Sequence, residues 1–154
     1  MIKYRNKDGI KFMMDNNLVE RKSSIVEFPN IPREFMWDFI RGYFDGNGSL
    51  ILHKTPYNVY GQISITSGSS SFVSKLQDFL TAEDIESHIY KDGRDNHNAI
   101  YLRVINKRNV YKFCQNIYMS KNEFPYLERK YQKYITLLNF QPKYKSSNRL
   151  HDIV

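Results

Sequence analysis

Cysteine and long apolar runs are scarce in this sequence of 154 residues. The single cysteine, Cys114, excludes an intrachain disulfide framework and favours a reducing, cytosolic setting. No apolar run approaches the roughly 18 residues that a membrane-spanning helix requires, and the N-terminal stretch lacks the apolar segment of a signal peptide. We therefore expect a single intracellular domain without a membrane partner, since the length suits one core.

Acidic charge is also in short supply: 23 Lys and Arg face 16 Asp and Glu, which leaves a formal net charge of +7. The surplus lies at the two ends, with +3 in residues 1–33 and +4 in residues 121–154 around a neutral middle. Such a distribution is compatible with a solvated surface or with a polyanionic partner, chiefly nucleic acid. The 12 tyrosines and 10 phenylalanines fit the second interpretation without proving it.

Helical periodicity opens the main part of the chain. Residues 7–17 suit a short helix, and the segment FPNIP at residues 28–32 then interrupts the backbone, because proline lacks an amide donor. From Arg33, apolar residues recur at three- and four-residue spacing, which predicts a helix of about three turns. We expect the run Asp45-Gly-Asn-Gly to end it, with glycines available for positive φ.

Alternating segments predict two hairpins. The runs SLILHKT and NVYGQISIT form one pair, and SHIYK and AIYLRVIN form the other. A serine cluster at residues 67–71 supplies the N-cap of an intervening helix, and two further helices follow the second hairpin. The order predicts an α+β fold in which helices cover one face of a four-stranded antiparallel sheet. We place this domain at residues 31–140, between an N-terminal extension (1–30) and a basic tail (141–154).

The other face of the predicted sheet is rich in amides, hydroxyls, aromatic rings and arginine, groups that suit base edges in a major groove. A merely solvated sheet face is the alternative. In the second hairpin turn, Arg94 is a further candidate contact to DNA. The other candidate DNA-binding residues are Ser49, Ile51, His53, Thr55, Asn58, Tyr60, Gln62, Ser64, Thr66, His88, Tyr90, Tyr101 and Arg103.

The segment IRGYFDGNG, Ile40 to Gly48, resembles the signature of the LAGLIDADG homing endonucleases. The hairpin–helix–hairpin–helix order that follows resembles the αββαββα half-domain of that family. FPNIPREFMWDFIRGYFDG resembles the lead-in to the second motif of two-motif members, and YLERKYQKY at residues 126–134 resembles their C-terminal helix. The resemblance spans roughly residues 24–134.

The resemblance implies roles for individual residues. Gly42 and Gly46 would form the close helix–helix contact of a dimer interface, because small residues let two helices approach. Asn47 occupies the position of the metal-binding acid and, with Gly46, would lie at a Mg²⁺ ion that supports phosphodiester hydrolysis. Asp45 is also a catalytic candidate, but the resemblance implies a more structural role, in which it ties the helix end to the interface. Lys107 matches by position a basic residue that assists the active site.

The chain departs from the family pattern in two ways. It carries one motif where a composite site needs two, so either two chains form a homodimer or a first half-domain is missing. Residues 1–23 resemble the tail of such a half-domain. In addition, the amide of Asn47 can coordinate Mg²⁺ but carries no charge and accepts no proton.

Three hypotheses follow from this combination. The first is a site-specific, Mg²⁺-dependent endonuclease for double-stranded DNA, of mobile-intron or phage origin, in the cytoplasm of a bacterial or phage-infected cell or in an organellar matrix. The second is a nuclease-inactive DNA-binding regulator or an RNA-splicing maturase on the same fold. The third is half of a decayed enzyme that only folds.

Overall fold

A computed structural model describes residues 26–91, 93, 99–119 and 125–141 of the chain. The short 3₁₀ helix η2 (Arg33–Phe35) leads into helix α2 (Met36–Asn47). The remaining elements are β1 (Gly48–Lys54), β2 (Val59–Ser67), α3 (Ser70–Ala82), β3 (His88–Lys91), β4 (Ile100–Val104), α4 (Lys107–Ile117) and α5 (Glu128–Leu138). No helix within these ranges is both long and apolar enough to cross a bilayer.

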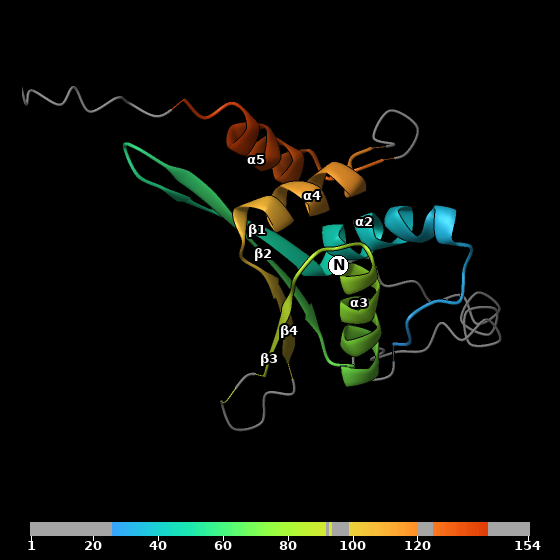
Figure 1. Cartoon of the computed structure of the whole chain (residues 1–154). Helices are drawn as coiled ribbons and strands as arrows, with labels where there is room; N and C mark the ends of the chain where they lie inside the picture. The colour runs from blue at the N-terminus through green and yellow to red at the C-terminus, as the bar shows by residue number, and fades with distance from the viewer. Residues whose placement is uncertain (1–25, 92, 94–98, 120–124, 142–154) are drawn as a thin grey trace, which may run out of the picture.

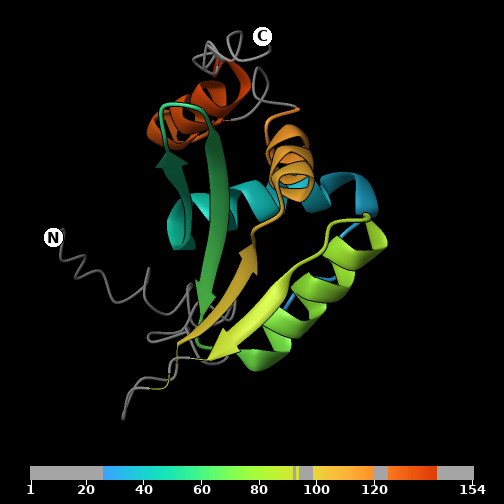
Figure 2. The ribbon, with the colours of Figure 1, turned by 60° about the vertical axis from the view of Figure 1, so that its left-hand side comes forward.

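The four strands form one antiparallel sheet in the order β1-β2-β4-β3. In the described part of the chain the helices lie on one side of this sheet, and the β1–β2 hairpin extends beyond them (Figure 1). Figure 2 shows the strands side by side from a second direction. The predicted α+β class, with its four-stranded sheet covered on one face, is confirmed.

Alternation along the strands creates the two faces. In β2, Ile63 and Ile65 are fully buried, whereas the residues between and beside them are partly exposed. The buried side receives Phe44 from α2, Phe72 from α3 and Phe113 from α4, all almost inaccessible to solvent. Period-2 apolar residues in the strands and period-3.6 apolar residues in the helices therefore meet in one core.

Side-chain caps fix where two of the helices begin. The Ser69 hydroxyl accepts a hydrogen bond from the amide of Phe72 at 3.2 Å, as the serine cluster predicted. The Asn106 side chain likewise accepts a bond from the amide of Arg108 at 2.9 Å. Both caps satisfy amides that the first helical turn leaves unpaired.

Helix α2 ends within the predicted run Asp45-Gly-Asn-Gly, but without the positive φ expected of its glycines. The helix continues through Asp45 and Gly46 to Asn47, and the chain passes directly into β1 at Gly48. Among the described glycines none has a positive φ, and the one described residue with a positive φ is Asp84, after α3. Gly48 is extended, with φ −104° and ψ 167°, a conformation that any residue can adopt. Glycine is needed there because a side chain would have no room.

The segment before η2 also contacts the core. Phe28 lies 5.7 Å from Phe72, 6.1 Å from Phe39 and 6.4 Å from Phe79, measured between ring centroids. The boundaries proposed at residues 30 and 140 remain predictions, but Phe28 packs with the domain. The remainder of the predicted extension, including the helix at residues 7–17, and most of the basic tail lie outside the described residues.

Candidate nucleic-acid interface

The register of the sheet brings most of the candidate DNA-binding residues onto one face. Directly opposed residues of neighbouring strands share a face of the sheet. The aligned pairs are Ser49 with Ser64, Ile51 with Gln62, His53 with Tyr60, Thr66 with Tyr101, Ser64 with Arg103, His88 with Arg103, and Tyr90 with Tyr101. We call this set the open face; it lies opposite the helices, and its role in binding DNA remains a prediction.

Aromatic and cationic groups gather at two places on the open face. His53 and Tyr60 stack with ring centroids 4.8 Å apart and an interplanar angle of 14°. The Arg103 guanidinium carbon lies 4.8 Å from the ring centroid of Tyr90 and 5.8 Å from that of Tyr101. Rings and a guanidinium held in this way present flat, rigid surfaces and positive charge.

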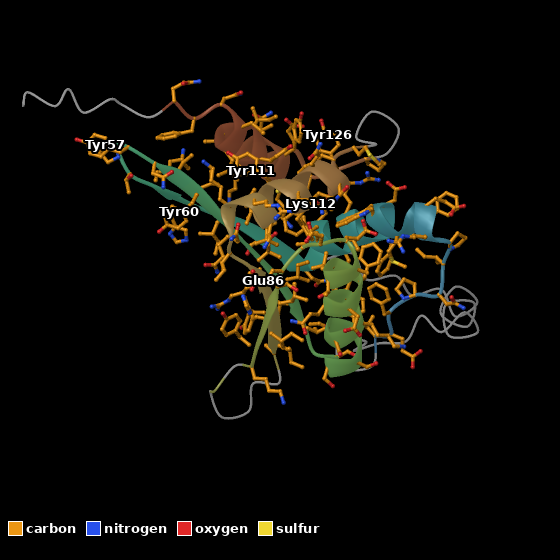
Figure 3. The ribbon with its side chains drawn as sticks, in the orientation of Figure 1. Tyr57, Tyr60, Glu86, Tyr111, Lys112 and Tyr126 are labelled. Atoms are coloured by element: carbon orange, nitrogen blue, oxygen red, sulfur yellow. The ribbon has the colours of Figure 1, made fainter. Side chains whose placement is uncertain are left out.

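Two candidates do not lie in strands. Thr55 and Asn58 form the β1–β2 turn, where the Thr55 hydroxyl accepts a bond from the Asn58 amide at 2.9 Å and donates one to its carbonyl at 3.2 Å. The hydroxyl of Thr55 therefore holds the turn. Figure 3 shows Tyr57 at the tip of this hairpin and Tyr60 farther along it. The exposed ring of Tyr57 could not be predicted as a surface residue from the alternating pattern of the strands, because that pattern does not extend into a turn.

One carboxylate lies beside the open face. Nε2 of His88 lies 3.6 Å from a carboxylate oxygen of Glu86, which comes just before β3. The strands themselves contain no Asp or Glu. The described strands thus bring no carboxylate of their own to the open face, and Glu86 lies at the rim beside β3.

The end of α2 presents the motif. Gly46 and Asn47 are both exposed residues. Asp45 turns inward, and its Oδ2 accepts a hydrogen bond from the amide of Leu127 at 2.8 Å. Leu127 is the N-cap residue of α5, where an anionic acceptor complements the helix dipole. This geometry fits the structural role that the resemblance assigns to Asp45.

Lys130 lies directly behind the motif and was not selected from the sequence. Its side chain is only 1% exposed. Its Nζ donates to the carbonyl of Phe44 and, at 2.9 Å, to the carbonyl of Asp45. Burial lowers the pKa of Lys130, and the neighbouring Asp45 carboxylate partly opposes that shift. The sequence could have indicated this burial, because Lys130 shares a helical stripe with the apolar residues Leu127, Tyr134 and Leu137.

A second buried cation joins α2 to α4. Arg41 Nη1 donates to the carbonyl of Ile117 at 3.3 Å, and its Nη2 lies 3.0 Å from Asp38 Oδ1. The same region contains Tyr118, whose pKa is raised chiefly by burial and also by Cys114 and Asp45. The back of the motif is therefore a dense set of charged and phenolic groups.

The remaining surface of α2 carries the predicted dimer contact. Gly42 and Gly46 are exposed, and a Cβ atom built on either would meet no described atom within 4 Å. Phe35 continues this stripe two turns before Gly42 and is 54% exposed. The described residues thus leave a smooth, partly apolar stripe uncovered, and the identity of its partner remains a prediction.

Two predicted residues remain, Lys107 and Arg94. Lys107 is exposed in the first turn of α4, and its Nζ is 5.8 Å from the ring centroid of Tyr111, one turn along the same helix. Arg94 lies outside the described residues. The structure therefore does not test either assignment.

The donor set at the motif can be compared with the needs of a Mg²⁺ ion. The described residues contain no group of three His, Cys, Asp or Glu side chains that would hold a metal. At the motif, the Asn47 amide and the Gly46 carbonyl offer neutral oxygens on two exposed residues. Oxygen donors are the right kind for Mg²⁺, which commonly keeps several waters and takes further ligands from phosphate. The set fits an ion that a second motif and DNA complete.

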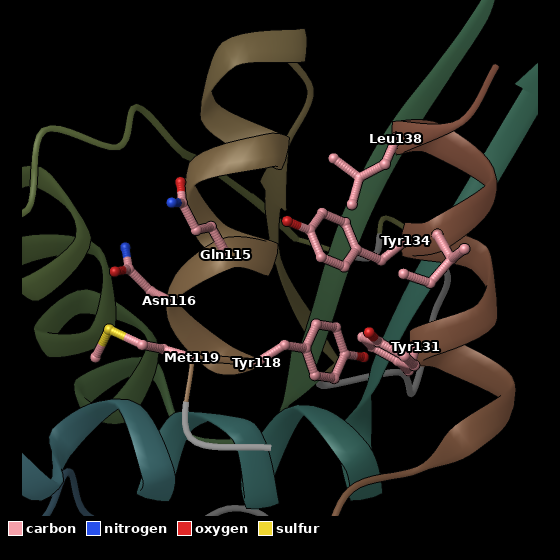
Figure 4. Close-up of a pocket in the computed structure, with 8 residues that line it drawn as sticks. Gln115, Asn116, Tyr118, Met119, Tyr131, Tyr134 and Leu138 are labelled. Atoms are coloured by element: carbon pink, nitrogen blue, oxygen red, sulfur yellow. The ribbon is translucent and has the colours of Figure 1, made fainter. Parts of the chain in front are cut away.

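A separate hollow of about 410 Å³ lies between α4 and α5 (Figure 4). Tyr118, Tyr131 and Tyr134 line it together with amide and aliphatic side chains. It belongs to the helical layer, away from the open face. We assign it no part in nucleic-acid binding.

Comparison with known proteins adds three findings. The family model described as LAGLIDADG-like domain matches residues 34–118. A protein of Methanocaldococcus jannaschii named "Probable translation initiation factor IF-2" is 31% identical over 102 residues, which are 61% of this chain and 8% of that protein. The chain therefore spans a small part of this relative.

Two solved structures resemble the fold. The archaeal intron-encoded homing endonuclease I-Vdi141I, complexed with DNA, has a TM-score of 0.54 at 14% identity and covers 67% of this chain and 66% of its own. The group I intron-encoded homing endonuclease I-CeuI, complexed with DNA, has a TM-score of 0.54 at 13% identity and covers 86% and 63%. At these identities the likeness shows the fold alone.

Proposed function

Because this chain belongs to the LAGLIDADG-like domain family, we propose that it is a site-specific binder of double-stranded DNA that uses its open face. Catalysis depends on a composite site that two motifs form. Where both motifs bind metal, the reaction is Mg²⁺-dependent hydrolysis of a phosphodiester.

One observation carries the proposal: four strands without a carboxylate align hydroxyls, amides, rings and Arg103 on a surface opposite the helices. Polar groups of this kind can pair with base edges, while cationic groups bind phosphates and fix position. The rings of His53 and Tyr60 already stack, and the guanidinium of Arg103 already lies over the Tyr90 ring, which would lower the entropic cost of ordering these side chains on binding.

We further propose that α2 pairs with the α2 helix of a second copy. The exposed Gly42 and Gly46 allow the two helix backbones to approach, and the exposed Phe35 adds apolar area. Such pairing is symmetric, so each copy brings its own open face and its own Asn47 to the centre. A preceding half-domain that carries a matching helix would pack against the same stripe of α2.

The chain's own groups at the centre are the Asn47 amide oxygen and the Gly46 carbonyl. When bound there, a divalent ion would activate water and stabilise the leaving oxygen of the phosphodiester. Asn47 cannot take up a proton, so this residue positions and orients but does not act as a base. Asp45 keeps the end of α2 against α5 through the Leu127 amide.

Asn47 also favours a second candidate function, DNA binding without cleavage. A neutral amide at both central positions of a homodimer removes two negative charges from the metal site. A regulator would keep the open face and the dimer and lose only the chemistry. An RNA-splicing maturase would use the same fold with RNA as its ligand.

The test begins with selection of bound duplexes from a random DNA pool by the full wild-type chain, followed by nicking assays with Mg²⁺. We expect Asn47→Asp to raise Mg²⁺-dependent nicking of the selected duplex at least tenfold, because it restores a charged ligand. Asn30→Asp, the same change at an exposed position before η2, is the matched control and should leave the rate unchanged.

The outcomes separate the alternatives. Cleavage by the wild type supports the endonuclease, whereas tight, salt-sensitive binding with cleavage only in Asn47→Asp supports the regulator. Preference for RNA over duplex DNA supports the maturase. Failure of every variant to bind DNA at low salt contradicts the nucleic-acid function altogether.

A further inference from the structure

The end of α2 is held from behind by a buried ammonium group. Nζ of Lys130 reaches from the first turn of α5 to two consecutive carbonyls of α2, those of Phe44 and Asp45. These carbonyls precede Gly46 and Asn47, the two residues of the proposed metal position. Lys130 is almost completely buried and therefore contacts neither DNA nor metal directly.

The contact is specific for the last turn of a helix. Carbonyls of the last turn are short of intrahelical partners, and they carry the partial negative charge of the helix dipole. The Phe44 carbonyl accepts one bond from the Gly48 amide and a second from Lys130. The Lys130 Nζ also lies 4.5 Å from the centroid of the Phe44 ring. The Lys130 ammonium therefore contacts the ring and carbonyl of Phe44 and the carbonyl of Asp45 together.

Helices α2 and α5 each contribute a charged side chain that binds the backbone of the other. Lys130 in α5 binds the end of α2, and Asp45 in α2 binds the Leu127 amide at the start of α5. Each charge complements the helix end that it meets. Rotation of the Asp45–Gly46 peptide would break the bond from Lys130, so the direction of the following two residues is fixed.

We propose that Lys130 is a positioning residue that fixes the Gly46–Asn47 segment in the orientation required for divalent-metal binding. The inference rests on the proposed function, because it assigns a purpose to that segment. Loss of the ammonium would release the last turn of α2 while the strands and the core remain intact.

Lys133 provides a matched control. It lies one turn later in α5 and also donates to a backbone carbonyl, that of Leu50 at 2.9 Å, but this carbonyl belongs to β1. Lys130→Met removes the ammonium and keeps a side chain of similar length, which leaves the Phe44 and Asp45 carbonyls without this donor. Lys130→Arg retains the charge and the donors.

Two measurements on the full chain test the proposal. The first is amide hydrogen exchange of Asn47 and Gly48, followed by NMR without DNA or metal. The second is paramagnetic broadening of the same amides by Mn²⁺ in the presence of a selected duplex, in the wild type and in the Asn47→Asp background.

We expect exchange at Asn47 and Gly48 to accelerate at least tenfold in Lys130→Met and Mn²⁺ affinity to fall at least fivefold, with partial rescue by Lys130→Arg. Lys133→Met should change both quantities less than twofold. Unchanged exchange in Lys130→Met would overturn the proposal, as would faster exchange with undiminished Mn²⁺ affinity.

If Lys130→Met does not fold, Lys130→Arg decides: exchange at Asn47 and Gly48 that is less than tenfold faster than in the wild type supports the role of the charge, and exchange that is tenfold faster or more contradicts it. Absence of Mn²⁺ broadening in both the wild type and the Asn47→Asp background would overturn the metal site itself. That failure of the proposed function can be told apart from failure of the Lys130 proposal, because the exchange rates measure the effect of Lys130 on the end of α2 without any metal.

Discussion

Gly48 is the residue at which helix becomes strand, and space decides its identity. A Cβ atom at this position would lie 2.2 Å from Phe44 Cδ2 and 2.7 Å from the Phe44 carbonyl oxygen. Neither atom can move easily, because Phe44 is completely buried and its carbonyl receives Lys130. A side chain as small as a methyl group therefore conflicts with the core.

The first prediction concerns this contact. We expect Gly48→Ala to lower the free energy of unfolding by about 1–3 kcal/mol, the usual cost of overpacking a core. Chemical denaturation measures the change. Gly46→Ala, two residues earlier, meets no described atom within 4 Å and should not destabilise the isolated chain; an equal loss in both variants would contradict the steric explanation.

Cys114 gives a prediction at alkaline pH. Burial raises the pKa of its thiol from 9.0 to about 12. Above pH 9 the unfolded chain loses the thiol proton while the folded chain keeps it, so stability falls as pH rises toward the folded value. Two pH units above 9 correspond to about 3 kcal/mol of lost stability.

Denaturation of the wild type and of Cys114→Ala between pH 8 and 11 tests this effect. The wild type should lose more stability over the range than the variant. Burial also raises the pKa of Tyr111, Tyr118 and Tyr134, which adds a decline of the same sign to both proteins. Cys114 contributes to these three shifts, so the difference between the two curves reports the thiol together with its coupling to the tyrosines. Parallel curves would show that the thiol does not contribute.

At the scale of elements, charged side chains meet the ends of three helices. Asp45 lies at the start of α5, Lys130 at the end of α2, and Arg41 at the end of α4 through the Ile117 carbonyl. In each case the sign of the charge opposes that of the helix terminus. The motif helix takes part in all three contacts and is thereby fixed on its inner side.

The outer side of α2 yields the third prediction. Gly42→Ala should stabilise the monomer by about 0.5–1 kcal/mol, because alanine favours a helix and its Cβ meets open space. The same methyl group would hold two paired helices apart and should weaken self-association at least tenfold. Thermal denaturation at high dilution and sedimentation equilibrium measure the two effects, and unchanged association would contradict pairing through α2.

Elements were more predictable than their ends. Alternation in β2 and the spacing from Phe35 to Phe44 identified strand and helix, because burial on one face imposes a period. The sequence placed the end of α2 in the run Asp45-Gly-Asn-Gly but did not show that the helix keeps Asp45, Gly46 and Asn47. Two glycines favour a helix end locally, and the bonds from Lys130, more than 80 residues away, sustain the last turn.

Candidate site residues divide in the same way. Strand parity placed His53, Tyr60, Tyr101 and Arg103 on one face, since period and register suffice for that. Lys130 was missed because a lysine is ordinarily solvated, and its burial depends on tertiary contacts with α2.

At the scale of the whole molecule, charge predicts how binding should respond to salt. The net charge is +7, while strand residues contribute no carboxylate to the open face. We expect the logarithm of DNA affinity to fall linearly with the logarithm of salt concentration, because phosphate contacts release counterions.

Arg103→Gln should reduce the magnitude of that slope by about one if Arg103 binds a phosphate, or relax sequence preference if it binds a base. Fluorescence anisotropy over a salt series with selected and scrambled duplexes measures both. Lys75→Gln removes an exposed positive charge from α3, on the helical side, and is the control. Equal effects of the two substitutions would contradict binding through the open face.

The direct passage from Asn47 to Gly48 leaves no spacer between the central motif and the first strand. One additional residue at this junction would invert the facing of every side chain in β1 and disturb the Lys130 contacts at once. Changes of target length are therefore expected to arise in the hairpin turns and in the pairing of subunits. If β1 contacts bases as proposed, the distance from the motif to the first base that β1 contacts should be the least variable dimension of the recognised site.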